Sequence, residues 1–509
     1  MKVFKKYAGS TARKYLAKRN LSCPIRADVQ ETKTGAKPFN SIPGPKSLPL
    51  VGTLWNYVPL LGEYRFDHLH VNGLRKLRKY GPLVREDIVP GVSVVWVYTP
   101  EDIETVYRCE GRYPERRSHL ALQKYRRDRP HIYNSGGLLP TNGEEWWKLR
   151  SVFQRCLSRV QDVRSHLPVT DTIMTEFTKY AAKNSIPTTD FLPKLSRLHL
   201  ELTCMTAFST RLQSFSDPEQ LSQSRSSQLI SAAATTNSCI LRTDNGPQLW
   251  RWVRTPLYRK LEQALHTLEL TAVALVNKVQ QEREGGKAGS SLVAQYLAAA
   301  DLNIRDIYGM AVDLILAGID TTTYTSCFAL YHLATHPQVQ TQLYEEACRL
   351  LPLSTDAITS TSLTQAVVCR AVVKETLRLN PVSVGVGRIL AKDAVLSGYN
   401  VPAGTVVVTQ NQVTCRLDEY FPQPNDFIPA RWMKGTPEYR TCSPYLVLPF
   451  GHGPRACIAR RLAEQALQVL LLRMVREYEL SWEGGKLDVR SLLINKPDGP
   501  VLLRLKNRS

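Results

Sequence analysis

The residue with the clearest chemistry in this sequence is Cys457, which follows the chain-breaking residues Gly451, Gly453 and Pro454. Residues 460–475 then read as a helix, with apolar side chains at helical spacing at Ala463, Ala466, Leu467, Leu470, Leu471 and Met474. Helix amide N–H groups and the positive dipole end would face the sulfur, so we expect a lowered thiol pKa and a metal-ligating thiolate. Glycines without a Cβ would let a flat macrocycle approach this backbone. A buried cysteine at a helix start is the alternative.

A second chemical feature lies inside the longest helical pattern, which begins at the N-cap residue Asn303 and ends before Pro337. At 1.5 Å per residue this helix would be roughly 50 Å long. Residues 317–322 read Ala-Gly-Ile-Asp-Thr-Thr, so small residues precede the carboxylate of Asp320 and the hydroxyl of Thr321. Small residues would let a flat ligand press against the helix. An Asp-Thr pair in a helix is more often simply solvated.

A third feature opens the helix expected from Gly143, where Trp146 and Arg150 stand four residues apart and share one face. An indole N–H and a guanidinium that face the same way could bind a carboxylate through charge-assisted hydrogen bonds. A solvated arginine beside a core tryptophan is the commoner outcome for such a pair.

Elements that must position these residues are also visible. Apolar runs over 83–87 and 92–98 flank a Pro-Gly pair and predict a hairpin, and Thr99 then predicts a helix N-cap. Ser362 to Gln365 predicts a capping box that starts a single helix ending before Pro381. In that helix Glu375 and Arg378 are three apart and can pair.

In this order, the motifs resemble those of the cytochrome P-450 family of haem-thiolate monooxygenases. The family pattern F-x-x-G-x-R-x-C-x-G matches from Phe450 through Arg455 to Cys457, and departs only where Ala459 replaces glycine. The A-G-x-D-T-T, W-x-x-x-R and E-x-x-R motifs also match, and the resemblance covers about residues 38–509. It implies a mainly α (α+β) fold: a large helical domain, a small β-rich lobe, and haem b between the long central helix and the cysteine loop.

The resemblance also implies roles for individual residues. Cys457 would be the axial iron ligand, Thr321 would hydrogen-bond dioxygen, and Asp320 would help to relay protons for O–O cleavage. The other residues expected beside the cofactor are Trp146, Arg150, Ala317, Gly318, Arg388, Phe450 and Arg455, of which Trp146, Arg150 and Arg388 would hold haem propionates. Val382, Val384 and Val386 would line the substrate side of the ring.

Two further groups follow from the same resemblance. Glu375, Arg378 and Arg431 would form a buried network that supports the haem loop, where the loss of one member strands a charge. Arg370 and Lys374, four apart on an expected helix, match basic positions with which mitochondrial members bind an acidic ferredoxin. The alternative is that these two cations lie on an exposed stripe of the helix and contact only solvent. The implied partners are an iron–sulfur ferredoxin of the adrenodoxin type and its NADPH-dependent reductase.

Composition agrees with a globular enzyme. The sequence has 509 residues and a formal net charge of +21, which favours an acidic partner or an anionic membrane. No nucleic-acid-binding module accompanies the charge, so nucleic acid is not an expected partner. The 11 cysteines include no C-x-x-C pair, which indicates reduced thiols and argues against a zinc site or a disulfide framework. No stretch has the roughly 20 consecutive apolar residues of a membrane span.

The first 35 residues carry nine lysines and arginines but only two acidic residues, with aromatic and aliphatic side chains between them. This pattern is typical of a mitochondrial transit peptide, so we expect residues 1–36 to be a leader and 37–509 the enzyme domain. A disordered basic tail is the alternative. The expected location is the matrix side of the mitochondrial inner membrane, with peripheral membrane contact; the basic-aromatic stretch 249–260 could lie in that interface or simply cover the core.

Three longer stretches, 84–91, 113–122 and 135–143, resemble the arthropod ecdysteroid 22-hydroxylases of the mitochondrial class. This resemblance implies ferredoxin-dependent hydroxylation of an ecdysteroid precursor at C-22 in moulting-hormone biosynthesis, with a steroid and molecular oxygen as substrates. Alternatives are a mitochondrial monooxygenase of another sterol, lipid or xenobiotic, a non-catalytic haem-binding carrier or sensor, and a rearranging enzyme of the same fold that needs no ferredoxin.

Overall fold

The computed structural model describes residues 35–508 apart from 90–91, 184–188, 247 and 287–288. The chain divides into two units, 1–37 and 38–509, and the description below concerns the second. The expected leader, residues 1–36, lies outside the described residues except for its last two.

The second unit is built mostly from helices. Short 3-10 turns η1 to η5 lie at Phe39–Ser41, Leu54–Tyr57, Pro218–Gln220, Leu249–Arg251 and Pro429–Trp432. The α-helices are α2 (Leu69–Tyr80), α3 (Pro100–Arg108), α4 (Leu120–Arg127), α5 (Gly143–Phe153), α6 (Arg155–Ser158), α7 (Val160–Ser165), α8 (Leu167–Lys183), α9 (Leu192–Phe208), α10 (Arg225–Asn245), α11 (Pro256–Glu284), α12 (Leu292–Leu297), α13 (Ile304–Thr335), α14 (Pro337–Leu350), α15 (Ser360–Gln365), α16 (Val367–Leu379), α17 (Asn411–Thr414) and α18 (Arg460–Glu477).

The strands form one four-stranded sheet and three two-stranded ones. The larger sheet has the order β1-β2-β6-β3, with β2 and β6 parallel and the outer pairs antiparallel. The small sheets pair β10 with β7, β4 with β5, and β8 with β9. Strand bounds are β1 Leu83–Val89, β2 Val92–Val97, β3 Gly387–Ile389, β4 Ala394–Leu396, β5 Tyr399–Val401, β6 Val406–Thr409, β7 Tyr478–Trp482, β8 Val489–Leu492, β9 Ile494–Pro497 and β10 Leu503–Asn507.

Local signals explain several of these elements. The predicted hairpin is confirmed, since β1 and β2 pair antiparallel with Val84 opposite Trp96. The Thr99 cap is confirmed as well, because its hydroxyl accepts a hydrogen bond from the N–H of Asp102 at 3.3 Å. The capping box predicted to begin at Ser362 is wrong. Thr359 is the cap residue, with Ser362 as its reciprocal partner. The first helix ends at Gln365 and the next begins at Val367, so α15 and α16 are separate helices.

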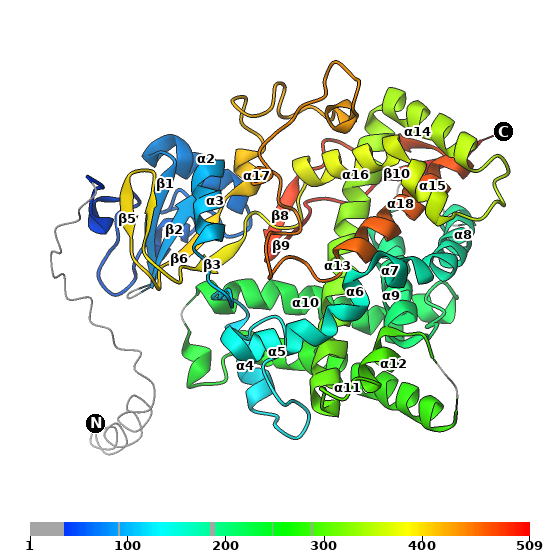
Figure 1. Ribbon diagram of the computed structural model, residues 1–509, viewed down its shortest axis with the longest axis horizontal. Helices are drawn as coiled ribbons and strands as arrows, with labels where there is room; N and C mark the ends of the chain where they lie inside the picture. The colour runs from blue at the N-terminus through cyan, green and yellow to red at the C-terminus, as the bar shows by residue number, and fades with distance from the viewer. Residues whose placement is uncertain (1–34, 90–91, 184–188, 247, 287–288, 509) are drawn as a thin grey trace. The chain divides into compact units, whose positions relative to one another are not determined.

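Helix α13 runs through the helical part of the unit, while the larger sheet lies to one side (Figure 1). It starts at the predicted cap, where Asn303 accepts from the N–H of Arg305 at 2.9 Å and Asp306 accepts from the N–H of Asn303 at 3.2 Å. One apolar core packs α13 with α4, α5 and α9 to α12, and a second packs it with α8, α14, α16 and α18. Because both cores share α13, its residues are held in place from several directions.

The predicted fold class is therefore confirmed: a large helical part with a small β-rich lobe. Within the described residues, every helix is too short or too polar to cross a lipid bilayer.

Candidate functional site

The cysteine loop is closed by backbone hydrogen bonds just before α18. The N–H of Cys457 donates to the carbonyl oxygen of Phe450 at 2.8 Å, and the N–H of Ala456 donates to Gly453 at 3.0 Å. Gly451 and Gly453 both have φ of 71°, a backbone conformation that side chains with a Cβ rarely adopt. A Cβ at Gly453 would also lie 2.4 Å from a carboxylate oxygen of Glu110. Both glycines are thus required by the shape of the loop.

The thiol of Cys457 lies one turn before the helix, and its side chain remains exposed. The expectation of a lowered pKa for this thiol is wrong. Protein packed around the sulfur raises the pKa above the ordinary value, although the N–H of Ala459 and the charges of Arg150 and Arg460 act in the opposite direction. Coordination to a metal cation removes the thiol proton outright, so this environment still permits a thiolate ligand. Ala459 has a φ of −97°, which alanine adopts without strain.

On α13, Ala317 and Thr321 stand four residues apart and share an accessible stripe of the helix. The hydroxyl of Thr321 donates to the carbonyl oxygen of Ala317 at 2.7 Å. Gly318 faces α9 instead, where a Cβ would lie 2.5 Å from the hydroxyl oxygen of Thr203. This packing differs from the expectation that Gly318 lies against a flat ligand: its missing side chain lets two helices approach each other.

Asp320 is the buried acid of this helix, with 2% of its surface exposed. One of its oxygens accepts a hydrogen bond from the side-chain amide of Asn237 in α10 at 2.9 Å. Burial raises the pKa of Asp320 to about 6, against the opposing effects of Asn237, Lys496 and Tyr324. A carboxyl group with this pKa can hold or release a proton close to neutral pH.

The α5 pair lies against the cysteine loop. Arg150 donates from a terminal nitrogen to the carbonyl oxygen of Ala456 at 2.9 Å, directly before Cys457. The buried ring of Trp146 stacks beneath the guanidinium of Arg455, whose central carbon lies 4.3 Å from the ring centroid. Two helix-borne side chains predicted from a four-residue spacing are thus brought to one loop.

Arg455 is nearly buried, and its donors are only partly used. One terminal nitrogen donates to the carbonyl oxygen of Thr141 and to the side-chain oxygen of Asn142, the latter at 2.9 Å. The other two nitrogens, Nε and Nη1, are buried with no hydrogen-bond partner among the described residues. Burial, together with repulsion from Arg116 and Arg388, lowers the pKa of Arg455, yet a guanidinium in a protein stays charged.

Arg388, expected to hold a propionate, makes several hydrogen bonds within the protein. It donates to Glu110 at 2.6 Å and to the carbonyl oxygen of His452 at 3.1 Å. Half-buried Arg116 lies on the same side of the loop, where it donates to the carbonyl oxygen of Leu139 at 2.8 Å. The arginines described around the cysteine loop (Arg116, Arg150, Arg388 and Arg455) therefore outnumber the buried carboxylate described beside them, that of Glu110.

These features fit haem b. The group carries two propionates, and the unpaired buried donors of Arg455, with Arg116 and Arg150 nearby, supply the positive charge that two carboxylates need. The exposed thiol of Cys457 is the type of ligand that haem-thiolate proteins use. Phe450, at the start of the loop, packs against the apolar core that includes α18, and its ring lies 5.4 Å from the guanidinium carbon of Arg460.

The Glu375 network is buried and fully satisfied. Arg378 donates to both carboxylate oxygens of Glu375, at 2.9 and 2.7 Å, and also to the carbonyl oxygens of Cys415, Pro424 and Asp426. Arg431 donates to Glu375 at 3.3 Å, and the indole N–H of Trp432 donates to it at 2.8 Å. The network fastens the segment 415–432 to α16.

The two expected docking cations of α16 have different environments. Lys374 is exposed, with its nitrogen 5.8 Å from the ring centroid of Trp432. Arg370 is half-buried and donates to the carbonyl oxygens of Leu363 and Thr364 at the end of α15. It still lines a pocket of about 360 Å³, whose other basic residues are Arg164 and Arg461.

The valine segment 382–386 is half-buried beside the cysteine loop. Val382 and Val384 accept backbone hydrogen bonds from Asn495 and Gln412, at 2.7 and 3.0 Å. A Cβ at Gly451 would lie 3.9 Å from the side chain of Val386, so Val386 is close to the loop.

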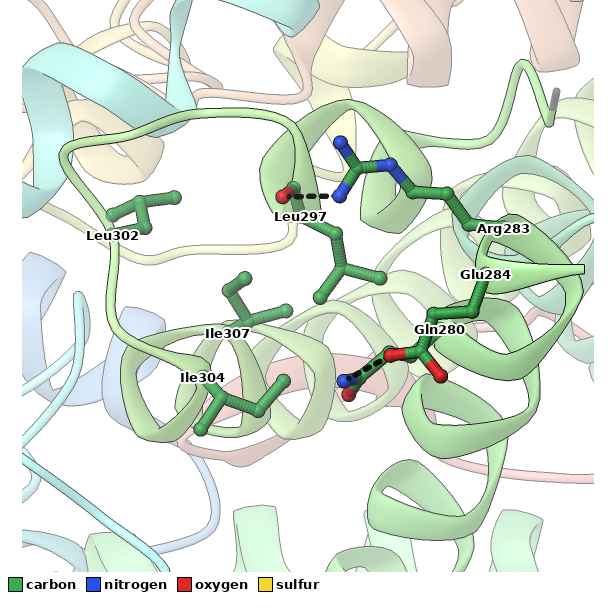
Figure 2. A pocket seen from close by; sticks show the side chains of 7 residues that line it. All are labelled: Gln280, Arg283, Glu284, Leu297, Leu302, Ile304 and Ile307. Carbon is green, nitrogen blue, oxygen red and sulfur yellow. Dashed lines mark hydrogen bonds between the residues drawn. The ribbon is translucent and has the colours of Figure 1, made fainter. Parts of the chain in front are cut away.

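A pocket of about 450 Å³ lies elsewhere, between the end of α11, α12 and the start of α13 (Figure 2). In that view Arg283 donates across it to the carbonyl oxygen of Leu297, at 2.7 Å. It is lined by Gln280, Arg283, Glu284, Leu297, Leu302, Ile304 and Ile307, none of which was predicted to carry chemistry.

Sequence reasoning missed Asn237, Glu110, Asn142 and Arg116 as neighbours of the site. Arg116 and Asn142 fall in two of the stretches that carry the closer resemblance, and that resemblance is the signal that could have found them. No sequence signal could have found Asn237 and Glu110, because each is brought to the site by a hydrogen bond to a residue at least 80 positions away.

Comparison with known proteins also supports a site for haem b with a cysteine ligand. The Cytochrome P450 family profile matches residues 42–502. The chain is 51% identical to "Cytochrome P450 302a1, mitochondrial" of Drosophila melanogaster, over 93% of this chain and 96% of that protein. It is 31% identical to "Probable cytochrome P450 12b2, mitochondrial" (94% and 91%) and 29% identical to "Ecdysone 20-monooxygenase" (92% and 88%), both of the same fly. The chain thus belongs to the cytochrome P450 family and is a haem-thiolate monooxygenase with haem b as cofactor.

Proposed function

We propose that this monooxygenase is ferredoxin-dependent and hydroxylates an ecdysteroid precursor at C-22. The observation that carries the substrate class is the resemblance of 84–91, 113–122 and 135–143 to the arthropod ecdysteroid 22-hydroxylases. The 29% identity to a protein named "Ecdysone 20-monooxygenase" agrees with a steroid of this kind. The main competing hypothesis is the same chemistry on another sterol, lipid or xenobiotic.

Two of these stretches lie beside the site. Thr141 and Asn142, in the third stretch, accept hydrogen bonds from Arg455. Leu138, in the same stretch, donates its N–H to Asp313 of α13 at 3.2 Å. The second stretch contains Arg116 and the start of α4. Residues that contact the arginine of the cysteine loop and a buried acid of α13 are therefore among those that carry the resemblance.

The residues divide the work of the reaction as follows. Bound haem b supplies the oxidising chemistry at iron, with Cys457 as its ligand. Arg455, Arg116 and Arg150 would hold the propionates, and the Arg150 contact to Ala456 fixes the cysteine loop. Thr321 presents a hydroxyl on the accessible stripe of α13. Asp320, on the buried side, would hold and release a proton in the relay, because its pKa near 6 lets it exchange a proton close to neutral pH.

The electron donor is proposed to be an acidic iron–sulfur ferredoxin of the adrenodoxin type, reduced by its NADPH-dependent reductase. Lys374 is exposed on α16, and the pocket between α7, α15, α16 and α18 is lined by Arg164, Arg370 and Arg461 against one acid, Glu464, so this surface carries net positive charge. Oppositely charged surfaces accelerate encounter, and salt screens this attraction. Reduction by ferredoxin should therefore slow as ionic strength rises.

The proposed location is the matrix side of the mitochondrial inner membrane, after loss of the leader 1–36. Relatives at 51% and 31% identity are named mitochondrial. Exposed apolar side chains gather in two segments that could enter the lipid interface: Leu50, Leu60 and Leu61 in one, and Leu249, Trp252 and Val253 in the other. The second segment alternates these residues with Arg251 and Arg254, as membrane-surface segments do.

The test is reconstitution of purified protein with ferredoxin, its reductase, NADPH and a labelled ecdysteroid precursor that lacks the C-22 hydroxyl. One added oxygen atom at C-22, absent when ferredoxin is withheld, would support the proposal. Binding spectra with a panel of sterols test the competing hypothesis, because a spin-state change with other lipids and none with ecdysteroid precursors would refute the substrate assignment.

The same reconstitution also distinguishes a carrier and a rearranging enzyme from a monooxygenase. A haem-binding carrier or sensor would bind the steroid and accept electrons but release no hydroxylated product. A rearranging enzyme would form product with neither ferredoxin nor reductase. Either result would refute the proposed reaction while leaving the family assignment intact.

A further inference from the structure

The partner of Asp320 comes from a helix that none of the family motifs includes. The side-chain nitrogen of Asn237, in α10, donates to Oδ2 of Asp320 at 2.9 Å. Both side chains are buried, with 8% and 2% of their surfaces exposed. A carboxylate can only accept, so the amide nitrogen rather than the amide oxygen must face it. A buried contact of this kind restricts the rotation of both side chains.

Helix α10 is itself held by a closed set of polar contacts. Two turns beyond Asn237, Asp244 accepts from the backbone N–H groups of His119 and Leu120 at the start of α4, at 2.5 and 2.9 Å. At the other end of α4, Arg126 donates to Asp313 of α13 at 2.7 Å. The contacts therefore run from α13 through α4 and α10 and return to α13 at Asp320.

Each of the three helices α4, α10 and α13 makes two of these polar contacts, about two turns apart. Asp313 and Asp320 on α13 are seven residues apart, as are Asn237 and Asp244 on α10. A shift of α10 along its axis would strain both of its contacts together. The amide of Asn237 is consequently presented to Asp320 from a fixed position.

We propose that Asn237 is a positioning residue for proton delivery in this enzyme. It holds Oδ2 of Asp320 against α10, and because a carboxyl group is planar, this also sets the direction in which Oδ1 points. The inference rests on the proposed role of Asp320 as a proton relay. It adds the residue that orients the relay and selects its working pH.

The chemistry of an amide suits this role. An arginine or lysine at this position would form an ion pair and keep the carboxylate ionised. An apolar side chain would give the charged carboxylate no hydrogen bond and so favour the protonated acid. The other polar groups that act on Asp320 are the Tyr324 hydroxyl, one turn further along α13, and Lys496 in β9. A neutral donor leaves the acid able to exchange its proton near neutral pH.

The test compares Asn237→Leu with wild type and with Asn245→Leu, in the haem-loaded enzyme with ferredoxin, reductase and the steroid. Asn245 is a suitable control because it lies on the same helix and donates to the carbonyl oxygen of Leu241 at 3.0 Å. Two quantities are followed between pH 5 and pH 9. One is the ratio of product formed to NADPH consumed; the other is the infrared carboxyl band of protonated Asp320, assigned by its loss in Asp320→Asn.

Loss of the amide removes a stabiliser of the charged form, so the midpoint of the infrared band should move up by about one pH unit. The alkaline limb of the product ratio should move with it, and the ratio at its optimum should fall roughly tenfold. Asn245→Leu should leave both quantities unchanged. Asn237→Ala, which is smaller than asparagine, gives the same comparison if the leucine variant does not fold.

The outcomes distinguish the two proposals. If Asp320→Asn lowers the product ratio but both Asn237 variants keep the wild-type ratio and band midpoint, the positioning role is refuted while the relay survives. If Asp320→Asn leaves the ratio unchanged, the relay itself fails, and the inference about Asn237 fails with it.

Discussion

Replacement of Glu375 by glutamine should be among the most damaging single changes in this protein. Glu375 accepts two hydrogen bonds from Arg378, one from Arg431, one from the indole of Trp432 and one from the N–H of Ile428 at 3.1 Å. Glutamine keeps the shape but removes the charge, and it turns one acceptor into a donor that faces other donors. Both guanidinium groups are then buried without an anion.

Breaking a buried ion pair from one side costs about 3–5 kcal/mol in the free energy of unfolding. Domains are typically stable by only about 5–15 kcal/mol, so Glu375→Gln should lose a large share of the total. The assay is equilibrium guanidinium denaturation of the haem-loaded protein, followed by far-ultraviolet circular dichroism. Haem content after purification gives a second readout, and it should fall in the variant.

Glu479→Gln is the matched control. Glu479 pairs with Lys506 across strands β7 and β10 at 3.2 Å, but it is 55% exposed. Exposed pairs contribute at most about 1 kcal/mol, so this variant should be nearly as stable as wild type. If Glu375→Gln lost no more stability than Glu479→Gln, the reasoning about the buried network would be wrong.

Three further predictions concern the site. Thr321→Ala should leave steroid binding intact and lower product formed per NADPH by about tenfold or more, measured as hydrogen peroxide released; full coupling would contradict the role of the hydroxyl. Asp320→Asn should raise the free energy of unfolding at pH 8 by up to about 3 kcal/mol, because the folded pKa near 6 lies above the unfolded value and the charged acid opposes folding. That gain should shrink as the pH falls from 6 to 4, and a gain independent of pH would refute it. Lys374→Glu should raise the ferredoxin concentration needed for half-maximal rate several-fold and flatten its salt dependence, while an equal effect at high salt would argue against electrostatic docking.

The sequence was most informative where chemistry is local. The start of α13 could be read from Asn303 and Asp306, since a capping box uses residues three apart. The turn before Cys457 could be read from its glycines, and the shared face of Trp146 and Arg150 from their spacing. In each case the residues that interact lie within one or two turns of each other.

It was least informative where the outcome depends on which elements meet. Gly318 packs against Thr203 of α9, and Arg370 donates hydrogen bonds to carbonyl oxygens at the end of α15. Neither neighbour can be inferred from residue spacing. The thiol pKa was predicted in the wrong direction because the protein atoms packed around the sulfur, which come from several elements, outweigh the local N–H groups and charges. Asn237 could not be found at all, since its contact to Asp320 spans 83 residues.

The central claim is that the Cys457 thiolate ligates haem iron, and the absorption spectrum of the reduced protein under carbon monoxide tests it most directly. We expect the strongly red-shifted Soret band that thiolate ligation produces, and its loss in Cys457→His with haem still bound. A Soret band at the shorter wavelength typical of a histidine or neutral thiol ligand in the wild-type protein would contradict the account.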